Sequence, residues 1–462
     1  MKIEATTAKA YQLVHDGILA LARAERQGIR IDTEYCEQKI QHLTRKIQYL
    51  EKKLEDTKFY RHWQHIYGRK TNIHSNHQLS RILYKDMKIE PLKMTGKGVQ
   101  GATDEAALEQ INIPELKTIL EIRKLAKIKD TYLGAFLREA SDGYIHPFFN
   151  LHTVKTHRSS SSCPNFQNVP KRDKEALKIC RRALFPRPGH MLVEADFSSI
   201  EVMLSCCYSK DPTMINYVKN KKSDMHLDMA KQIFIFDKLD KNLSAHAILR
   251  QAAKNAFVFP QFYGDYYGNN VKGLADWVKL PQSRWKSGMG VELPDGRYIS
   301  DHLSTQGIRS FDKFTEHLKG VENDFWNNRF KVYNAWRKAW VAEYRKKGYL
   351  KMLTGFICSG IMGKNEIMNY PIQGTAFHCL LKTFILLDEA MRKEQWDTKL
   401  IGQIHDSIIM DVNPNEFEHV QLTAHKIVKE ELPALWNWIN VPLNIEIDVY
   451  GVDQSWVKPI TL

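Results

Sequence analysis

The segment MLVEADFSSIEVMLSCC, residues 191–207, places an acidic side chain at the end of an apolar strand. Leu192, Val193 and Ala195 predict a short buried strand that ends at Asp196, and the residues from 198 to 207 predict a helix. An aspartate at a strand end, with a backbone carbonyl beside it, is suited to bind a hard cation through oxygen. The alternative is that Asp196 only caps the helix that follows.

A second acidic residue lies in LIGQIHDSIIMDV, residues 400–412. Apolar residues on both sides of His405, Asp406 and Ser407 predict a β-hairpin with Asp406 at or near its tip. Aspartate is common in turns for conformational reasons alone, so this pattern by itself leaves a purely structural role open.

Two further segments combine charge with polar or aromatic groups. In HAILRQAAKNAFVFPQFYG, residues 246–264, Arg250 and Lys254 share a helix face and aromatic residues follow them. Cations on one face suit a triphosphate and an aromatic ring suits a base or sugar; the alternative is a solvated basic face over a buried aromatic one. In THRSSSSCPNFQNVP, residues 156–170, one arginine, four serines and three amides suit sugar and phosphate contacts, or an ordinary surface loop.

The amino-acid composition indicates which classes of binding partner are favoured. The chain has 462 residues, a net charge of +14 and a pI near 9.2, which favours binding to polyanions, with nucleic acid first and an anionic membrane surface second. No apolar run reaches the roughly 18 residues of a membrane-spanning helix. The seven cysteines form no pattern with zinc-ligand spacing, which favours a reducing interior and a cytoplasmic location.

The N-terminal part reads as helical. Helices are predicted over residues 8–27, with Gly28 as C-cap, over 33–57, with Asp32 or Thr33 as N-cap, and from 104 to about 140, with Pro114 at the start of one of them. Short strands and turns follow, which sets a boundary near residue 143. The basic helix 33–57 is either a solvated face or an arm along a phosphate backbone, and residues 265–330 show no clean periodicity.

Taken together and in this order, the segments resemble family A DNA polymerases, the group of bacterial DNA polymerase I. VEADFSSIEV resembles that family's motif A, RQAAKNAFVFPQFYG resembles motif B (R-x3-K-x7-Y-G), and IHDSI resembles motif C (H-D-E). THRSSSSCPNFQNVP, MNYPIQGTAFH and LARAERQGIRID resemble further segments, so the resemblance runs nearly from end to end.

The resemblance implies an α+β right-hand fold with an antiparallel-sheet palm, helical fingers and a helical thumb. By analogy, residues 1–145 form the thumb and N-terminal helical region, 146–240 the first part of the palm, 241–370 the fingers and 371–462 the second part of the palm. A phage-type origin fits the compact plan. No proofreading domain is expected, so a separate exonuclease or processivity factor is left open as a partner.

The resemblance also implies a reaction, in which a primer 3′-hydroxyl attacks the α-phosphate of a dNTP. Two Mg²⁺ ions, for which Mn²⁺ can substitute, would be held by Asp196, Asp406 and the backbone carbonyl of Phe197. The other implied residues are, for the nucleotide, Arg250, Lys254 (which also protonates pyrophosphate), Phe259, Tyr263, Glu201 as a steric gate and His226, and, for primer–template DNA, Arg158, Asn165, Gln167, Gln373 and His405.

Two of the places where the chain departs from the family pattern lie in motifs B and C. Ser407 replaces the third carboxylate of motif C, and its hydroxyl could hydrogen-bond a metal-bound water instead. Motif B has one extra residue between Lys254 and Tyr263, which predicts a π-bulge and favours the register with Phe259 and Tyr263 at the nucleotide.

Three alternatives to a replicative polymerase remain at this stage: a single-subunit RNA polymerase, an inactive primer–template clamp, and a specialised repair or lesion-bypass polymerase. Glu201 argues against the first, because its carboxylate would occupy the place of a ribose 2′-hydroxyl. The two aspartates and two cations argue against the second.

Overall fold

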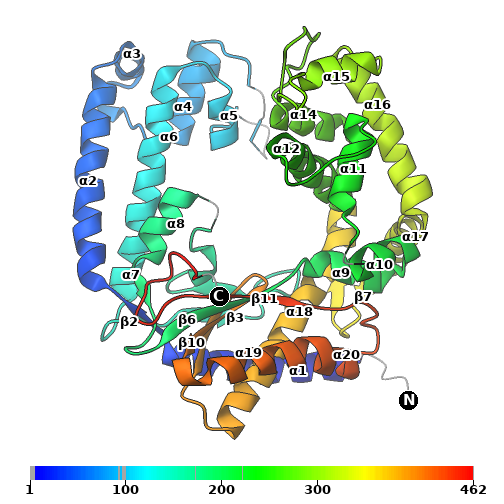
Figure 1. Cartoon of the computed structure of the whole chain (residues 1–462). Helices are drawn as coiled ribbons and strands as arrows, with labels where there is room; N and C mark the ends of the chain where they lie inside the picture. The colour runs from blue at the N-terminus through cyan, green and yellow to red at the C-terminus, as the bar shows by residue number, and fades with distance from the viewer. Residues whose placement is uncertain (1–5, 92–93, 96–99, 172, 221, 461–462) are drawn as a thin grey trace.

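The computed structural model describes residues 6–91, 94–95, 100–171, 173–220 and 222–460. Two helical arms rise from a floor that contains a four-stranded antiparallel sheet (Figure 1). We call residues 33–139 the thumb arm, residues 225–330 the fingers arm, and the sheet with its packed helices the palm. The mixture of helical arms and an antiparallel sheet confirms the α+β prediction.

The palm sheet has the strand order β11-β6-β10-β9. Its strands are β6 (Met191–Phe197), β9 (Lys399–Ile404), β10 (Ser407–Val412) and β11 (Ile445–Val449). Strand β6 is paired on both sides and is buried along most of its length, which explains its nearly continuous apolar sequence. In Figure 1, helices α1 (Thr7–Gln27), α18 (Lys364–Lys393) and α19 (Phe417–Lys426) lie beneath this sheet.

Helix α1 packs against the palm, away from the other helices of the expected 1–145 unit. The guanidinium of Arg23 donates two hydrogen bonds to one carboxylate oxygen of Asp388 in α18, at 2.7 and 3.0 Å, and one to the other. Gly17 allows a close approach of Leu381, because a Cβ at this position would lie 2.9 Å from the leucine side chain. The boundary at residue 145 stays a prediction, but α1 belongs structurally with the palm.

The thumb arm contains the predicted helices. They are α2 (Thr33–Glu55), α3 (Lys58–Tyr67), α4 (Asn76–Ser80), α5 (Glu105–Glu109), α6 (Pro114–Ala126) and α7 (Gly134–Glu139), with π-helical turns at Arg81–Asp86 and Lys127–Leu133 and a 3₁₀ turn at Gly68–Lys70. Asp32 is the N-cap of α2, since its side chain accepts a hydrogen bond from the Tyr35 N–H at 2.9 Å. Gly28 ends α1 with a positive φ of 68°, and Pro114 begins α6 as predicted.

The fingers arm contains the region whose fold the sequence did not reveal. Its helices are α11 (Met225–Phe234), α12 (Ser244–Ala253), α13 (Phe259–Phe262), α14 (Tyr267–Trp277), α15 (Ile299–Thr305) and α16 (Phe311–Asp324), with π-helical turns at Lys254–Val258 and Phe325–Arg329. Phe325 packs edge to face with Phe262 and with Phe330, which are themselves in tilted contact, in an aromatic core. Helix α11 packs on α12, across the expected boundary at residue 240, so that boundary stays a prediction.

The remaining helices and strands lie outside the two arms and the palm sheet. They are β1 (Ile29–Ile31), β2 (Tyr144–Ile145), β3 (Phe148–Asn150), β4 (Ser160–Ser162), β5 (Leu184–Phe185), β7 (Tyr349–Lys351), β8 (Ile357–Ser359), α8 (Lys174–Arg181), α9 (Ile200–Ser209), α10 (Pro212–Lys219), α17 (Lys331–Lys347) and α20 (Leu432–Leu435). Strands β2, β1 and β5 form a small antiparallel sheet that joins the base of the thumb arm to the palm. Within the described ranges, none of the helices is long and apolar enough to cross a bilayer.

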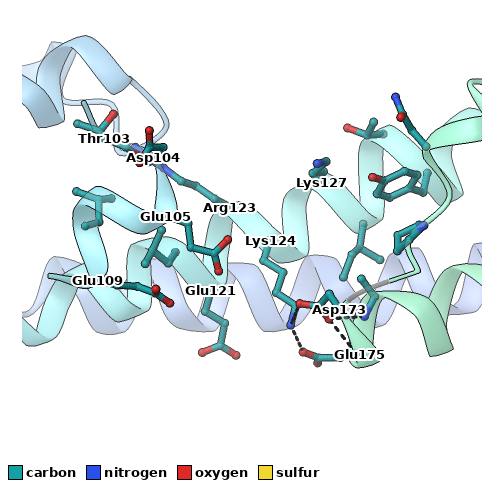
Figure 2. Close-up of a pocket in the computed structure, with 18 of the residues that line it drawn as sticks. Thr103, Asp104, Glu105, Glu109, Glu121, Arg123, Lys124, Lys127, Asp173 and Glu175 are labelled. Carbon is teal, nitrogen blue, oxygen red and sulfur yellow. Dashed lines mark hydrogen bonds and ion pairs between the residues drawn. The ribbon is translucent and has the colours of Figure 1, made fainter. Parts of the chain in front are cut away.

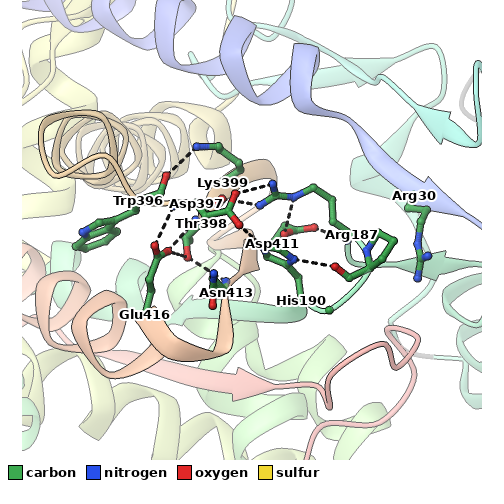
Figure 3. A network of polar contacts seen from close by, with 12 residues as sticks. Arg30, Arg187, His190, Trp396, Asp397, Thr398, Lys399, Asp411, Asn413 and Glu416 are labelled. Atoms are coloured by element: carbon green, nitrogen blue, oxygen red, sulfur yellow. Dashed lines mark hydrogen bonds and ion pairs between the residues drawn. The ribbon is translucent and has the colours of Figure 1, made fainter.

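A polar network secures the end of the palm sheet that lies away from the Asp406 turn (Figure 3). The backbone N–H and the Nε of Arg187 donate to the two carboxylate oxygens of Asp411 in β10, at 2.6 and 3.0 Å. The same guanidinium pairs with Asp397 at 2.9 Å, and His190 contacts Asp397 at 3.0 Å. These contacts join the segment before β6 to β10 and to the start of β9, so they help to set the register that aligns the two candidate aspartates.

Candidate active site

Asp196 and Asp406 meet where strands β6 and β10 are paired. Ser407 faces Asp196 in the strand register, and the Phe197 N–H donates to the Asp406 carbonyl at 3.0 Å. The predicted hairpin is confirmed, with a two-residue turn in which His405 has a φ of 53°. The capping alternative for Asp196 is wrong, because this residue lies inside β6 and α9 begins only at Ile200.

The electrostatics of Asp406 depend on its surroundings. Loss of hydration first, and the negative charge of Asp196 second, raise the pKa of Asp406, and against the opposing effects of Lys171 and Arg158 the net value is about 6. A carboxylate whose ionisation is disfavoured by a neighbouring carboxylate is one that a divalent cation would stabilise. Their chemistry therefore fits the predicted metal-binding role.

Beside this pair lies a buried carboxylate that the motifs did not indicate. Glu194 is only 3% exposed, and its pKa is lowered: burial alone would raise it, but the charges of Lys171 and Arg181 outweigh that effect. The Ser407 hydroxyl is buried and donates to Glu194 at 3.0 Å, and a hydrogen bond from this residue to a metal-bound water stays a prediction. The sequence did contain a signal for Glu194: it is a charged residue in an otherwise apolar strand, two positions before Asp196 and so on the same face of that strand.

A second cluster surrounds Glu201 at the start of α9. Its two carboxylate oxygens accept hydrogen bonds from the Arg158 guanidinium and from the Tyr263 hydroxyl. Arg158 also donates from Nε to the backbone carbonyl of Gln373 in α18, at 3.2 Å. The structure therefore brings together four predicted site residues from the palm, the fingers arm and the 156–170 segment.

A third cluster lies on the fingers arm. Arg250 donates from Nε to Asp224 at 2.7 Å, and the Lys254 ammonium lies 5.4 Å from the centre of the Phe259 ring. His226 contacts that ring edge to face, and burial, followed by the charge of Arg250, lowers the His226 pKa to about 4, so its imidazole is neutral at pH 7. Asp224, which holds Arg250, was not indicated by the sequence.

The extra residue of this helix is absorbed as predicted. Residues Lys254–Val258 are π-helical, and the Phe259 N–H donates to the Lys254 carbonyl, which is the five-residue spacing of a π-turn. Phe262 then packs in the aromatic core, whereas Tyr263 is exposed and reaches Glu201. This geometry agrees with the register that places Phe259 and Tyr263 toward the nucleotide.

A cleft of 2260 Å³ extends from the aspartates up the thumb arm. Asn165, Gln167, His405 and both aspartates line its palm end. Figure 2 shows part of its thumb side, where Lys124 of α6 pairs with Asp173, the N-cap of α8, and with Glu175 in the first turn of α8, at 2.7 and 2.9 Å. The predicted primer–template residues thus divide between this cleft and the Glu201 cluster.

A buried histidine supports the loop that carries Arg158. His378 in α18 is 1% exposed, its Nδ1 lies 2.7 Å from the Thr354 hydroxyl, and the Phe356 ring is stacked on it with centroids 3.9 Å apart. Phe356 also contacts His157, the residue before Arg158. Burial, followed by the charge of His157, lowers the pKa of His378 to about 3.

This histidine makes folding sensitive to acid. Its folded-state pKa lies below the unfolded value of about 6.5, so the unfolded state takes up the proton first and stability is lost as pH falls below about 6.5. From pH 7 to pH 5 this group should reduce the unfolding free energy by about 2 kcal/mol. Urea unfolding at both pH values, with wild type and His378→Gln, measures that difference; an equal loss in both proteins would contradict the assignment.

The sequence and the fold are similar to those of known proteins. The profile of DNA polymerase family A matches residues 33–457. DNA polymerase I of Aquifex aeolicus is 28% identical over 90% of this chain and 63% of its own length. DNA polymerase I of Geobacillus stearothermophilus is 26% identical over 94% of this chain and 44% of its own length. The chain therefore spans less than two thirds of these curated relatives.

Among solved structures, the POL domain of Pol1 from M. smegmatis, in complex with DNA primer-template and dNTP, has a similar fold. The TM-score is 0.71 at 23% identity, covering 96% of this chain and 70% of that one. This likeness confirms the expected right-hand polymerase fold. Since the family profile covers most of the chain, with the motifs around Asp196 and Asp406 inside the match, the chain belongs to DNA polymerase family A.

Proposed function

We propose that this chain carries out template-directed DNA synthesis, adding dNTPs to a primer 3′-hydroxyl with release of pyrophosphate. The observation that carries the proposal is the meeting of Asp196 and Asp406 on paired strands at the palm end of a large cleft. Membership of DNA polymerase family A supports it. The relatives are longer than this chain, so activities of their other parts are not included.

The proposed cofactor is a pair of Mg²⁺ ions at Asp196 and Asp406. Among the residues that the structure describes, no group of three or more His, Cys, Asp or Glu side chains forms a metal site. Two carboxylates, with the backbone carbonyl of Phe197 as the further proposed ligand, fit Mg²⁺, because this ion is usually held by one or two carboxylates together with waters and substrate phosphates. When bound, the ions would stabilise the attacking and leaving oxygens of the in-line displacement.

The fingers arm would hold the triphosphate of the incoming nucleotide. Arg250 and Lys254 come from consecutive turns of one helix, and Asp224 already orients the Arg250 guanidinium. Lys254 would also donate a proton to the departing pyrophosphate. Phe259 and the neutral His226 would form one wall of the nucleotide site, since their rings are in contact and Phe259 lies beside the Lys254 ammonium.

The primer–template duplex would lie in the cleft. Asn165, Gln167 and His405 line it, while Arg158 and Gln373 lie at the adjacent Glu201 cluster. Amide, imidazole and guanidinium donors suit the minor groove, where acceptors occur at purine N3 and pyrimidine O2 in every correct pair. Such contacts would test the geometry of a base pair without reading its sequence.

Glu201 is proposed to exclude ribonucleotides, and Glu201→Ala should therefore relax sugar selection. The expected rise in the ratio of rNTP to dNTP incorporation is about a hundredfold, the scale on which a pocket rejects one added hydroxyl. Single-nucleotide primer extension with dATP and ATP measures the ratio. Glu201→Gln keeps the volume and should keep most of the selectivity; an unchanged ratio in Glu201→Ala would contradict the gate.

Primer extension on a primed template tests the function as a whole. Purified protein should extend the primer with dNTPs in Mg²⁺ or Mn²⁺ and stop when the metal is chelated. A preference for rNTPs would indicate an RNA polymerase instead. Binding of the primed template without extension would indicate a clamp, and frequent misincorporation would indicate a lesion-bypass enzyme.

A further inference from the structure

The carboxylate of Glu194 contacts groups that are adjacent to both candidate metal ligands, Asp196 and Asp406. Oε1 accepts from the Ser407 hydroxyl at 3.0 Å and lies 3.2 Å from the Lys171 ammonium. Oε2 lies 3.4 Å from the Arg181 guanidinium. Ser407 follows Asp406 at the start of β10, and Glu194 lies in β6 with Asp196. The buried Glu194 side chain therefore connects the strand of Asp196 to the residue beside Asp406.

Lys171 joins Glu194 to Asp196. Its ammonium lies 2.9 Å from Oδ2 of Asp196, so one cation is shared between two carboxylates of the same strand. The Lys171 side chain is half exposed and lines the cleft, whereas Glu194 is 3% exposed. The buried carboxylate is therefore the fixed partner, and the lysine is the one that reaches the site.

Arg181 holds the opposite side of Glu194. It is buried, and its guanidinium lies over the Trp456 ring at 3.9 Å from the centroid, while its Nε donates to the Pro170 carbonyl at 3.3 Å. Glu194 thus contacts two cations: the buried Arg181 guanidinium on the side of the protein interior, and the half-exposed Lys171 ammonium on the side of the cleft. Pro170 precedes Lys171, so the same arginine also anchors the segment that carries the lysine.

Stability alone gives little reason for this arrangement. Burying a charge is costly, and replacing buried ion pairs by apolar residues of similar volume is often neutral or stabilising. The strand around Glu194 is otherwise apolar at Leu192, Val193 and Ala195, which shows that such residues fit there. What the charged pair provides is a fixed ammonium at Asp196.

We propose that Glu194 and Lys171 are positioning residues for the polymerase reaction. Glu194 holds the Lys171 ammonium against Asp196, and this resident cation keeps the Asp196 carboxylate in one orientation beside Asp406 until divalent cations and nucleotide arrive. The inference rests on the proposed function, because it assigns the pair a part in that reaction. It also has a consequence that is independent of DNA synthesis. The Lys171 ammonium competes with a divalent cation for Asp196, whereas the negative charge of Glu194 attracts the divalent cation.

The two residues should therefore have opposite effects on metal binding and the same effect on turnover. In Lys171→Met the competing cation is gone, so Mn²⁺ should bind more tightly. In Glu194→Gln a nearby negative charge is gone, so Mn²⁺ should bind more weakly. Both variants should lower kcat by about 10- to 100-fold, the usual effect of removing a partner that orients a metal ligand, with KM for dNTP little changed.

The experiment uses the full chain. Mn²⁺ binding without DNA is followed by electron paramagnetic resonance, and kcat and KM are measured by single-nucleotide primer extension. Glu446→Gln is the matched control: it removes the same charge from β11 at the position paired with Asp196, but its carboxylate contacts Ser198 at 3.0 Å. It should leave kcat near that of wild type.

A rescue variant separates positioning from simple loss of charge. Because the Ser407 hydroxyl lies 3.0 Å from Glu194, the exchange Glu194→Ser with Ser407→Glu returns a carboxylate to nearly the same place. It should recover most of the kcat lost in Glu194→Gln. Ser407→Glu alone sets two buried carboxylates side by side and should lower the thermal midpoint.

The results of these measurements either support or overturn the positioning role of Glu194 and Lys171. Opposite Mn²⁺ shifts with a shared loss of kcat support the proposal; unchanged Mn²⁺ binding and kcat, or an equal loss in Glu446→Gln, overturn it. If wild type adds no nucleotide, the proposed function fails, and the Mn²⁺ shifts alone decide whether the pair acts on Asp196. If Glu194→Gln does not fold, the half-exposed Lys171→Met provides the same test.

Discussion

Asp406→Asn and Asp196→Asn should each lower the rate of primer extension about a thousandfold while primer–template binding persists. Each change removes one unit of charge from a site where charges 4 Å apart interact by about 4 kcal/mol near a protein surface. A barrier higher by that amount corresponds to about a thousandfold in rate. Rapid-quench extension and fluorescence anisotropy with a labelled primer–template measure the two quantities.

The control for this prediction is the stability of the variant proteins. Because the folded-state pKa of Asp406 is about 6, above its ordinary value of 3.8, its ionisation destabilises the folded protein increasingly between about pH 4 and pH 6 and fully at pH 8, so a neutral asparagine should not reduce the unfolding free energy at pH 8 without metal. Urea unfolding tests this. Extension within tenfold of wild type by either variant would contradict the metal assignment.

Lys254→Ala should lower kcat by about 10²- to 10⁴-fold, the usual contribution of a positioned general acid. It should also raise KM for dNTP, because a cation that contacts the triphosphate is lost. The Lys254 ammonium lies beside Phe259 on the face that carries Arg250, so the nucleotide would meet both cations as it enters. Steady-state and single-turnover extension over a range of dNTP concentrations measure the two effects.

Lys254→Arg separates charge from proton donation. Arginine keeps the positive charge but does not release its proton at working pH, so KM should recover while kcat stays low. A variant that recovers both would show that Lys254 acts only by charge. Lys272, on the neighbouring helix α14, offers a control in Lys272→Ala, which should change neither constant by more than about twofold.

The sequence predicted the parts of the site that local pattern specifies. An apolar run that ends in Asp196, and two apolar runs around Asp406, each define a strand and a turn within a few residues. The extra residue before Tyr263 has only a few structural solutions in a helix, so the π-turn at Lys254–Val258 could also be predicted. The N-cap Asp32 and the first helical residue Pro114 follow the same local chemistry.

Contacts between distant segments could not be predicted in this way. Lys171 contacts Asp196 because the segment after Pro170 folds beside β6. Asp224, at the start of α11, contacts Arg250 in α12. The burial of Ser407 depends on Glu194 in the neighbouring strand. The placement of α1 beneath the palm rests on its contact with α18, more than 350 residues later, which no local period reveals.

The order of strands in the palm has a consequence for synthesis of the protein. β6 is central, but both of its partners lie far downstream: 210 positions separate Phe197 from Ser407, and β11 comes later still. At about 5–20 residues per second, β6 emerges from the ribosome roughly 10–40 s before β10. For that time an apolar strand has neither neighbour, so the nascent chain depends on its already completed thumb helices, or on a chaperone, to keep β6 from aggregating.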